Sequence, residues 1–153
     1  MDLIISPGVD EKVLFEEQLA LDHKCDVVLI DPDKPSEYII NKSNFKYLEG
    51  FLKSNKFSDK EYTLDFIFAK YAVQKSNILL QMDIEGSEYE VILSCKEELL
   101  KKFKIIIIEF HYLSNYLINP ANEIFQTVLK KLNKNHIPIH IHANNFTSPK
   151  YMK

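Results

Sequence analysis

The stretch LLQMDIEGSEYE, residues 79–90, decides the fold of this chain. Its opening residues are apolar or uncharged and contain no strand breaker, which is typical of a strand that is covered on both faces. Gly86 then relaxes the backbone, and Ser87 can cap a helix whose first turn carries two glutamates. We therefore predict a strand that runs through an acidic turn directly into a helix. Asp83 would stand at the carboxyl end of that strand, where open α/β sheets bind their ligands.

The same alternation of apolar runs and helically spaced segments extends to both sides of this stretch. We expect strands at 3–5, 27–30, 78–84, 104–110 and 137–142, and helices at 10–22, 65–74, 87–95 and 121–132. The expected apolar face of the first helix consists of Val13, Leu14, Phe15, Leu19 and Ala20. Residues 36–60 are polar, aromatic and lysine-rich, and they predict only a helix or irregular cover, with a short strand near residues 62–63.

Strands that are separated by helices require a mainly parallel sheet with right-handed crossovers. The predicted fold class is therefore α/β, a three-layer α/β/α sandwich of Rossmann-like type. At 153 residues, the chain is expected to form a single domain over 1–153.

Composition excludes several classes of protein. Nineteen basic residues against 22 acidic ones give a net charge of −3, so no broad basic surface is expected and no nucleic-acid partner is predicted. Cys25 and Cys95 lack metal or redox spacing, and two reduced, partly buried thiols favour a cytoplasmic protein. The apolar run at 105–108 is too short to span a bilayer, and no signal-peptide pattern precedes the first strand.

The polar residues that could take part in catalysis or binding follow the predicted strands. They are Ser6 and Gly8, Asp31, Asp83 and Glu85, Glu109 and His111, and His142 and Asn144. Because parallel strands end at one edge of a sheet, this placement predicts a ligand site at that edge.

The first strand ends in a turn formed by Ser6, Pro7 and Gly8. A glycine there would let a ligand approach the backbone, and the helix that follows offers free amide groups. A side chain at Gly8 is therefore expected to block the ligand and leave the fold intact. Asp31 follows about twenty-five residues after Ser6, where an acid can accept hydrogen bonds from ribose hydroxyls. The alternatives are an ordinary turn and a loop acid that starts the turn before Pro32.

Two further groups carry possible chemistry. Asp83 and Glu85 could act as a base, as metal ligands or as binders of a cation, or they could be a charge cluster at a helix start. His140 and His142 would share one face of a strand and could hold a metal with His111 or Asp83. The alternative is that one of these histidines packs in the core and the other meets solvent. Nothing in the sequence fixes the geometry of such a site, so no metal is predicted, although a divalent cation stays open.

The segment 82–88, MDIEGSE, resembles the most recognisable motif of the FkbM-like family of S-adenosylmethionine-dependent methyltransferases: an acid, any residue, Glu-Gly, a small residue and Glu. Three other segments resemble parts of the family in the same order. They are 6–8 with Phe15-Glu16 and 27–32 for the cofactor-binding half, 107–111 for the next strand, and 140–145, which ends in paired asparagines. The resemblance implies a class I methyltransferase fold. Because the chain ends soon after Asn145, the sheet is expected to lack the final antiparallel strand of that fold.

The resemblance implies transfer of the methyl group of S-adenosylmethionine to an oxygen, with a sugar or glycan hydroxyl as the expected acceptor and S-adenosylhomocysteine as the product. It places the cofactor at Ser6, Pro7, Gly8, Asp31 and Asp83, and the chemistry at Asp83, Glu85 and His111, of which His111 or Asp83 would be the base.

Two alternatives to this function stay open. The first is a catalytically degenerate cofactor- or nucleotide-binding module that acts as a partner subunit, an option that the single glycine of the first turn favours. A nicotinamide-dependent oxidoreductase is disfavoured because GxGxxG is absent. Homo-oligomerisation is left open.

Overall fold

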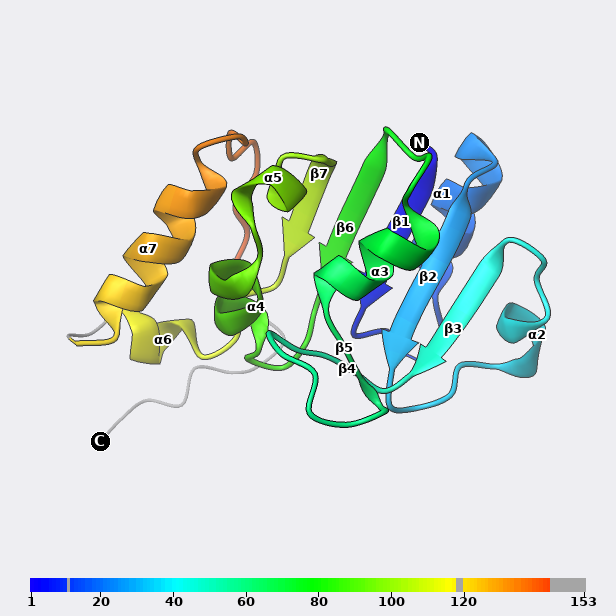
Figure 1. Ribbon diagram of the computed structural model, residues 1–153, viewed down its shortest axis with the longest axis horizontal. Coiled ribbons are helices and arrows are strands. Elements are labelled where there is room, and N and C mark those ends of the chain that lie inside the picture. Colours follow the sequence, from blue (N-terminus) through cyan, green and yellow to red (C-terminus); the bar gives the residue numbers. More distant parts are fainter. Residues whose placement is uncertain (11, 118–119, 144–153) are drawn as a thin grey trace.

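Five parallel strands form the central sheet of the computed structural model, which describes residues 1–10, 12–117 and 120–143. Their order across the sheet is β3-β2-β1-β6-β7. Their bounds are Leu3–Pro7 for β1, Asp26–Asp31 for β2, Phe45–Glu49 for β3, Ile78–Met82 for β6 and Phe103–Ile108 for β7. A separate parallel pair, β4 (Phe51–Leu52) and β5 (Glu61–Tyr62), lies beside the carboxyl edge of the sheet (Figure 1).

Helices cover both faces of this sheet (Figure 1). On one face, α1 (Leu14–His23) and α2 (Glu37–Ile40) enclose a core that includes Ile4, Val27 and Leu79. On the other face, the core includes Ile5, Leu80 and Met82. The helices that cover it are α3 (Leu64–Tyr71), α4 (Glu88–Ser94), α5 (Glu97–Leu100) and α7 (Asn122–Leu132), while the short α6 (Leu113–Tyr116) follows β7. The predicted α/β fold with its parallel, Rossmann-like sheet is confirmed.

The central strands are apolar throughout because both of their faces are covered. All five residues of β1 are buried, and β1 pairs in parallel with β2 on one side and with β6 on the other. Strand β6, which contains the apolar opening of the stretch 79–90, thus lies beside the middle strand β1. Its carboxyl end meets the turn that follows β1.

Three local expectations were wrong. Strand β3 was not expected, because this edge strand buries only Phe45 and exposes Lys46 and Glu49, so its side chains do not form a continuous apolar run. Residues 137–143 contain no strand, and Ile137, Ile139 and Ile141 are exposed, because no described strand pairs with them. In α1, Leu14 and Phe15 face solvent.

In this part of α1 the buried side chain is Glu16, whereas the apolar pattern had predicted that Leu14 and Phe15 would point inward. The reason is local, because Glu16 bonds to a buried hydroxyl of β1. None of the described helices combines the length and the apolar character that crossing a membrane requires.

Candidate active site

The turn after β1 is hydrogen-bonded to the loop after β6 and packs closely against it. Gly8 adopts φ +76°, and its amide donates to Ile30 O at 2.9 Å, while the Asp83 amide donates to Pro7 O at 3.1 Å. A Cβ atom on Gly8 would lie 1.4 Å from the carbonyl oxygen of Asp83. The protein's own backbone therefore requires this glycine. The expectation that a side chain at Gly8 would leave the fold intact is wrong.

Asp31 joins the same turn from the end of β2. Its Oδ2 accepts from Val9 N at 3.0 Å, and its Oδ1 accepts from Asp33 N at 2.8 Å. The carboxylate thus organises two loops of the protein. Each oxygen retains a second lone pair, so the group can still accept a hydroxyl of a ligand.

Ser6 and Pro7 are buried within β1. The Ser6 hydroxyl donates to Glu16 Oε1 at 2.5 Å and lies 2.5 Å from Gln81 Oε1. Ser6 can therefore influence a ligand only through Glu16 and Gln81. Both of these side chains line a neighbouring cavity.

That cavity has a volume of about 370 Å³ and opens beside the turn. Its walls come from residues 8–10, 12 and 14–16, together with Gln81, Asp83 and Ile107. Three acidic residues, Asp10, Glu16 and Asp83, and one basic residue, Lys12, are among the lining residues. The cavity can therefore suit a molecule that carries both signs of charge.

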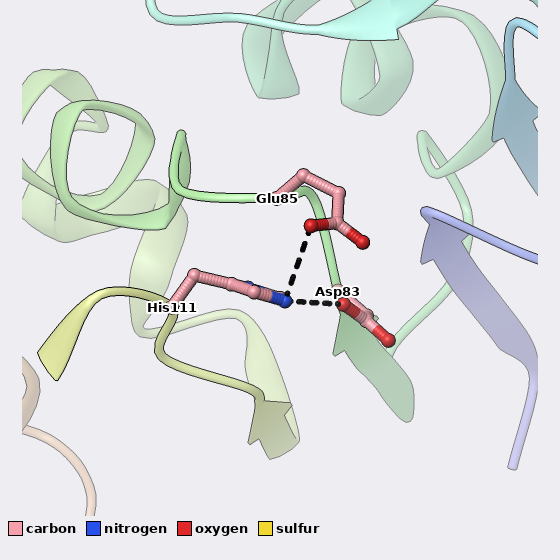
Figure 2. Close-up of side chains that lie close together, drawn as sticks. All are labelled: Asp83, Glu85 and His111. Carbon is pink, nitrogen blue, oxygen red and sulfur yellow. Dashed lines mark ion pairs between the residues drawn. The ribbon is translucent and has the colours of Figure 1, made fainter. Parts of the chain in front are cut away.

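A group of three side chains lies at the next strand ends. Figure 2 shows the ring of His111 pointing toward both Asp83 and Glu85, with its Nε2 atom 3.5 Å from Asp83 Oδ1 and 3.5 Å from Glu85 Oε2. The three ligand atoms all lie within 4.8 Å of one another. The fold thus brings His111 to Asp83 and Glu85, which precede it by more than twenty residues in the sequence. All three residues were predicted for the site from the sequence.

The shape of the loop explains how both acids reach the histidine. Strand β6 ends at Met82, and Glu85 has φ 55°, in the left-handed region that residues other than glycine rarely adopt. Gly86 follows with φ 104°. This reversal turns the Glu85 side chain back toward Asp83 and His111 (Figure 2).

Glu88 and Tyr89 in the first turn of α4 hold His111, and sequence reasoning assigned neither to the site. Glu88 is fully buried, and His111 Nδ1 lies 2.9 Å from its Oε1. The Tyr89 hydroxyl donates to His111 O at 2.8 Å. The same Glu88 oxygen accepts from the amides of Ile84 and Gly86, at 3.0 and 3.2 Å. One buried carboxylate thus fixes both the imidazole and the acidic loop.

A signal for Glu88 was present in the sequence. Its spacing from Gly86 places it in the first helical turn, and such a residue can point back to amides of the preceding loop. We had expected Glu88 only as a negative charge that suits the first turn of the helix. Ser87 makes no cap bond, and its hydroxyl accepts from Lys53 Nζ at 2.7 Å instead.

The crowding of acids changes the proton affinity of the cluster. Burial and the nearby charge of Glu109 raise the pKa of Asp83 above its ordinary value. Burial by itself lowers the pKa of His111, but the hydrogen bond with Glu88 and the negative charges around the ring outweigh it, so that pKa is raised. The neighbouring acids therefore favour a positive charge at this position.

The histidines near the carboxyl end do not join the cluster. His140 and His142 are exposed, with their rings stacked on each other at 6.2 Å between centroids. The option of a metal held by His142 and Asp83 was therefore wrong, since only His111 lies with the two acids among the described residues. Asn144 and Asn145 lie outside the described residues.

The parallel sheet with helices on both faces is consistent with the Rossmann-like fold of methyltransferases. Residues 54–137 match the model of the methyltransferase FkbM domain, and the chain belongs to that family. The matched range contains Asp83, Glu85, Glu88 and His111, and it excludes the turn at residues 6–8 and Asp31. Neither a curated protein nor a solved structure matches the chain.

Proposed function

We propose that this methyltransferase uses S-adenosylmethionine and methylates a hydroxyl oxygen of a sugar or glycan. The observation that carries the proposal is the position of His111. It faces two carboxylates beside the loop that contacts the Gly8 turn, in a chain of the FkbM methyltransferase family. The sugar acceptor follows from the family resemblance.

The cavity beside the Gly8 turn fits the charged end of the cofactor. The sulfonium and ammonium groups of S-adenosylmethionine are cationic, and the acidic residues Asp10, Glu16 and Asp83 are among those that line the cavity. Lys12, which also lines it, suits the cofactor's carboxylate. Asp31 is the candidate acceptor for the ribose hydroxyls, and the amide that it binds belongs to Val9, which lines the cavity.

When bound, the cofactor supplies an electrophilic methyl group, and the electrons of the broken carbon–sulfur bond stay on sulfur. The chain's part is to position the acceptor and to remove its proton. His111 is the candidate base because Glu88 holds its Nδ1 side and leaves Nε2 toward the open rim. Asp83 is the second candidate, and Glu85, which is mostly exposed, would contact the acceptor.

The proposal also covers the cell compartment and the partner. Cys25 and Cys95 are both buried free thiols, which supports a reducing compartment, and we assign the chain to the cytoplasm. The partner required by this function is a small-molecule or saccharide acceptor.

The rival proposal is a cofactor-binding subunit without turnover. It is supported by the single glycine of the first turn. Calorimetry with S-adenosylhomocysteine and a methyl-transfer assay on a panel of sugars separate the two. Binding together with turnover supports the enzyme, and binding without turnover on any acceptor supports the rival.

Asp31→Ala tests the cofactor site. The substitution should weaken S-adenosylhomocysteine binding by about 1.5–3 kcal/mol, the range for losing a charged hydrogen-bond partner. Asp33→Ala is the matched control, because its backbone amide, which bonds to Asp31, is kept. Unchanged affinity in folded Asp31→Ala would contradict the assignment.

A further inference from the structure

We propose that Asp83, Glu85 and His111 bind a divalent metal ion, with Glu88 holding the histidine ligand from behind. The binding itself is independent of the proposed function, and its chemical purpose rests on that function. The sequence did not predict this site.

The spacing of the three ligand atoms suits a metal ion. Two ligands that are each about 2.1 Å from an ion and about 90–110° apart are separated by about 3.0–3.4 Å. His111 Nε2 lies 3.5 Å from Asp83 Oδ1 and 3.5 Å from Glu85 Oε2. Side-chain shifts of a few tenths of an ångström would close the site, and Figure 2 shows the three groups directed to one point.

The hydrogen bond on the far side of the ring fixes which nitrogen faces this point. Glu88 Oε1 faces His111 Nδ1 at 2.9 Å and already accepts from two backbone amides, so a proton between the two atoms belongs to the ring nitrogen. The remaining nitrogen, Nε2, then directs a lone pair at Asp83 and Glu85. A carboxylate that holds the outer nitrogen of a histidine ligand is the usual arrangement around protein-bound metals.

The contacts of Nε2 fit a bound metal ion better than they fit hydrogen bonds from a second proton on the ring. Hydrogen bonds between nitrogen and oxygen are usually 2.7–3.2 Å long, and both contacts of Nε2 are longer than that. Three acceptor atoms that meet at these distances leave a central position for a cation. Glu88, which holds the ring from behind, also has one buried oxygen without a hydrogen-bond partner, so this inner carboxylate keeps an unused acceptor.

The ligand set indicates the class of metal. Two carboxylates and one imidazole suit Mn²⁺ or Zn²⁺, whereas Mg²⁺ and Ca²⁺ prefer oxygen ligands alone. Three protein ligands leave positions open, as in catalytic metal sites, and Glu85 is 82% exposed on the open side. A hydroxyl bound at an open position would become more acidic and release its proton to water, which would replace direct transfer to His111.

The test uses Mn²⁺ as the probe on the full chain after chelator treatment. Paramagnetic resonance of free Mn²⁺ should reveal one saturable site, and the relaxation of water protons should report exchangeable water on the bound ion. Asp83→Asn and Glu85→Gln should each weaken binding at least about ten-fold, and Glu88→Gln should weaken it about 10–100-fold as a partner of the ligand. Glu90→Gln, an exposed acid on the same helix, is the control and should bind normally.

Two results would overturn the proposal: no saturable Mn²⁺ or Zn²⁺ binding by the folded chain, or equal binding by wild type, Asp83→Asn and Glu85→Gln. Circular dichroism of each variant confirms that it is folded. Glu85 is exposed, so Glu85→Gln keeps the test decisive if the more buried variants fail to fold. S-adenosylhomocysteine binding on the same samples separates the two proposals. Metal binding without cofactor binding contradicts only the proposed function, and the reverse result contradicts only the metal site.

Discussion

Glu88 and His111 form a carboxylate–imidazole pair in which the carboxylate is fully buried and the imidazole reaches the rim of the sheet. The pair joins α4 to the loop after β7, and the Tyr89 hydroxyl reinforces it by bonding to His111 O. An unpaired buried carboxylate is costly, so the pair stabilises both elements only while both partners are present. The most informative substitutions therefore remove one partner at a time.

Glu88→Ala should lower the free energy of unfolding by about 2–3 kcal/mol, because the amides of Ile84 and Gly86 and the His111 ring lose their acceptor. Urea denaturation measures this change. Glu90 lies two residues further along α4 and is exposed, so Glu90→Ala should change the free energy of unfolding by less than about 1 kcal/mol. If the two variants lose equal free energy of unfolding, the hydrogen bonds of Glu88 contribute no more to stability than an exposed charge does.

His111→Ala should lower methyl-transfer turnover by roughly 10²–10⁴, whether the ring acts as a base or holds a metal. Affinity for S-adenosylhomocysteine should change little, since the ring is not among the residues that line the cavity beside Gly8. His23→Ala, on the exposed end of α1, serves as the control. If His111→Ala lowers the melting temperature and leaves the rate of the folded fraction unchanged, the histidine is structural.

Gly8→Ala and Gly86→Ala should differ sharply in stability, although both glycines have positive φ. A Cβ on Gly8 meets the backbone oxygen of Asp83 at 1.4 Å, whereas one on Gly86 meets the ring of Tyr112 at 2.7 Å. The Tyr112 side chain is exposed and can move, but the Asp83 backbone is held by its bond to Pro7. Thermal unfolding should therefore show a much larger loss for Gly8→Ala, and a loss no larger than that of Gly86→Ala would contradict the contact.

Asp2 should give stability that depends on pH. Its carboxylate accepts from the amides of Asn77 and Ser76, and these bonds hold its folded pKa well below the ordinary value. A lowered folded pKa means that the contribution is complete above the unfolded pKa, near 4, and is lost as the pH falls toward the folded pKa. The difference in melting temperature between wild type and Asp2→Asn should thus be largest near neutral pH and shrink below about pH 4. A constant difference across that range would contradict the assignment.

Hydrophobic pattern sufficed to predict the buried part of the fold. The continuous apolar runs in β1, β2 and β6 could only be strands covered on both faces, and their helical connections required a parallel sheet. The edge strand β3 escaped because its side chains are partly exposed. The segment 137–142 misled because alternation of isoleucine and histidine predicts a strand even where no neighbouring strand pairs with it.

The residues of the candidate site could be predicted from the sequence, but the residues that hold them in place could not. Acids after β6 and a histidine after β7 had to meet at one edge once the sheet was parallel. The spacing of Glu88 from Gly86 was a signal but not a sufficient one, because whether a glutamate at a helix start faces water or folds inward depends on the left-handed turn at Glu85. The role of Gly8 was misjudged for the same reason, since the sequence does not reveal which backbone will approach it.

The strand order also bears on how the chain is made. The middle strand β1 precedes its neighbour β6 by about seventy residues, from Pro7 to Ile78. At roughly 5–20 residues per second, a ribosome needs about 4–15 s to deliver β6 after β1 has been synthesised. During that interval β1 can pair with β2, but one of its edges stays open. The nascent chain therefore offers an apolar strand edge to chaperones until β6 and the acidic loop of the candidate site have been translated.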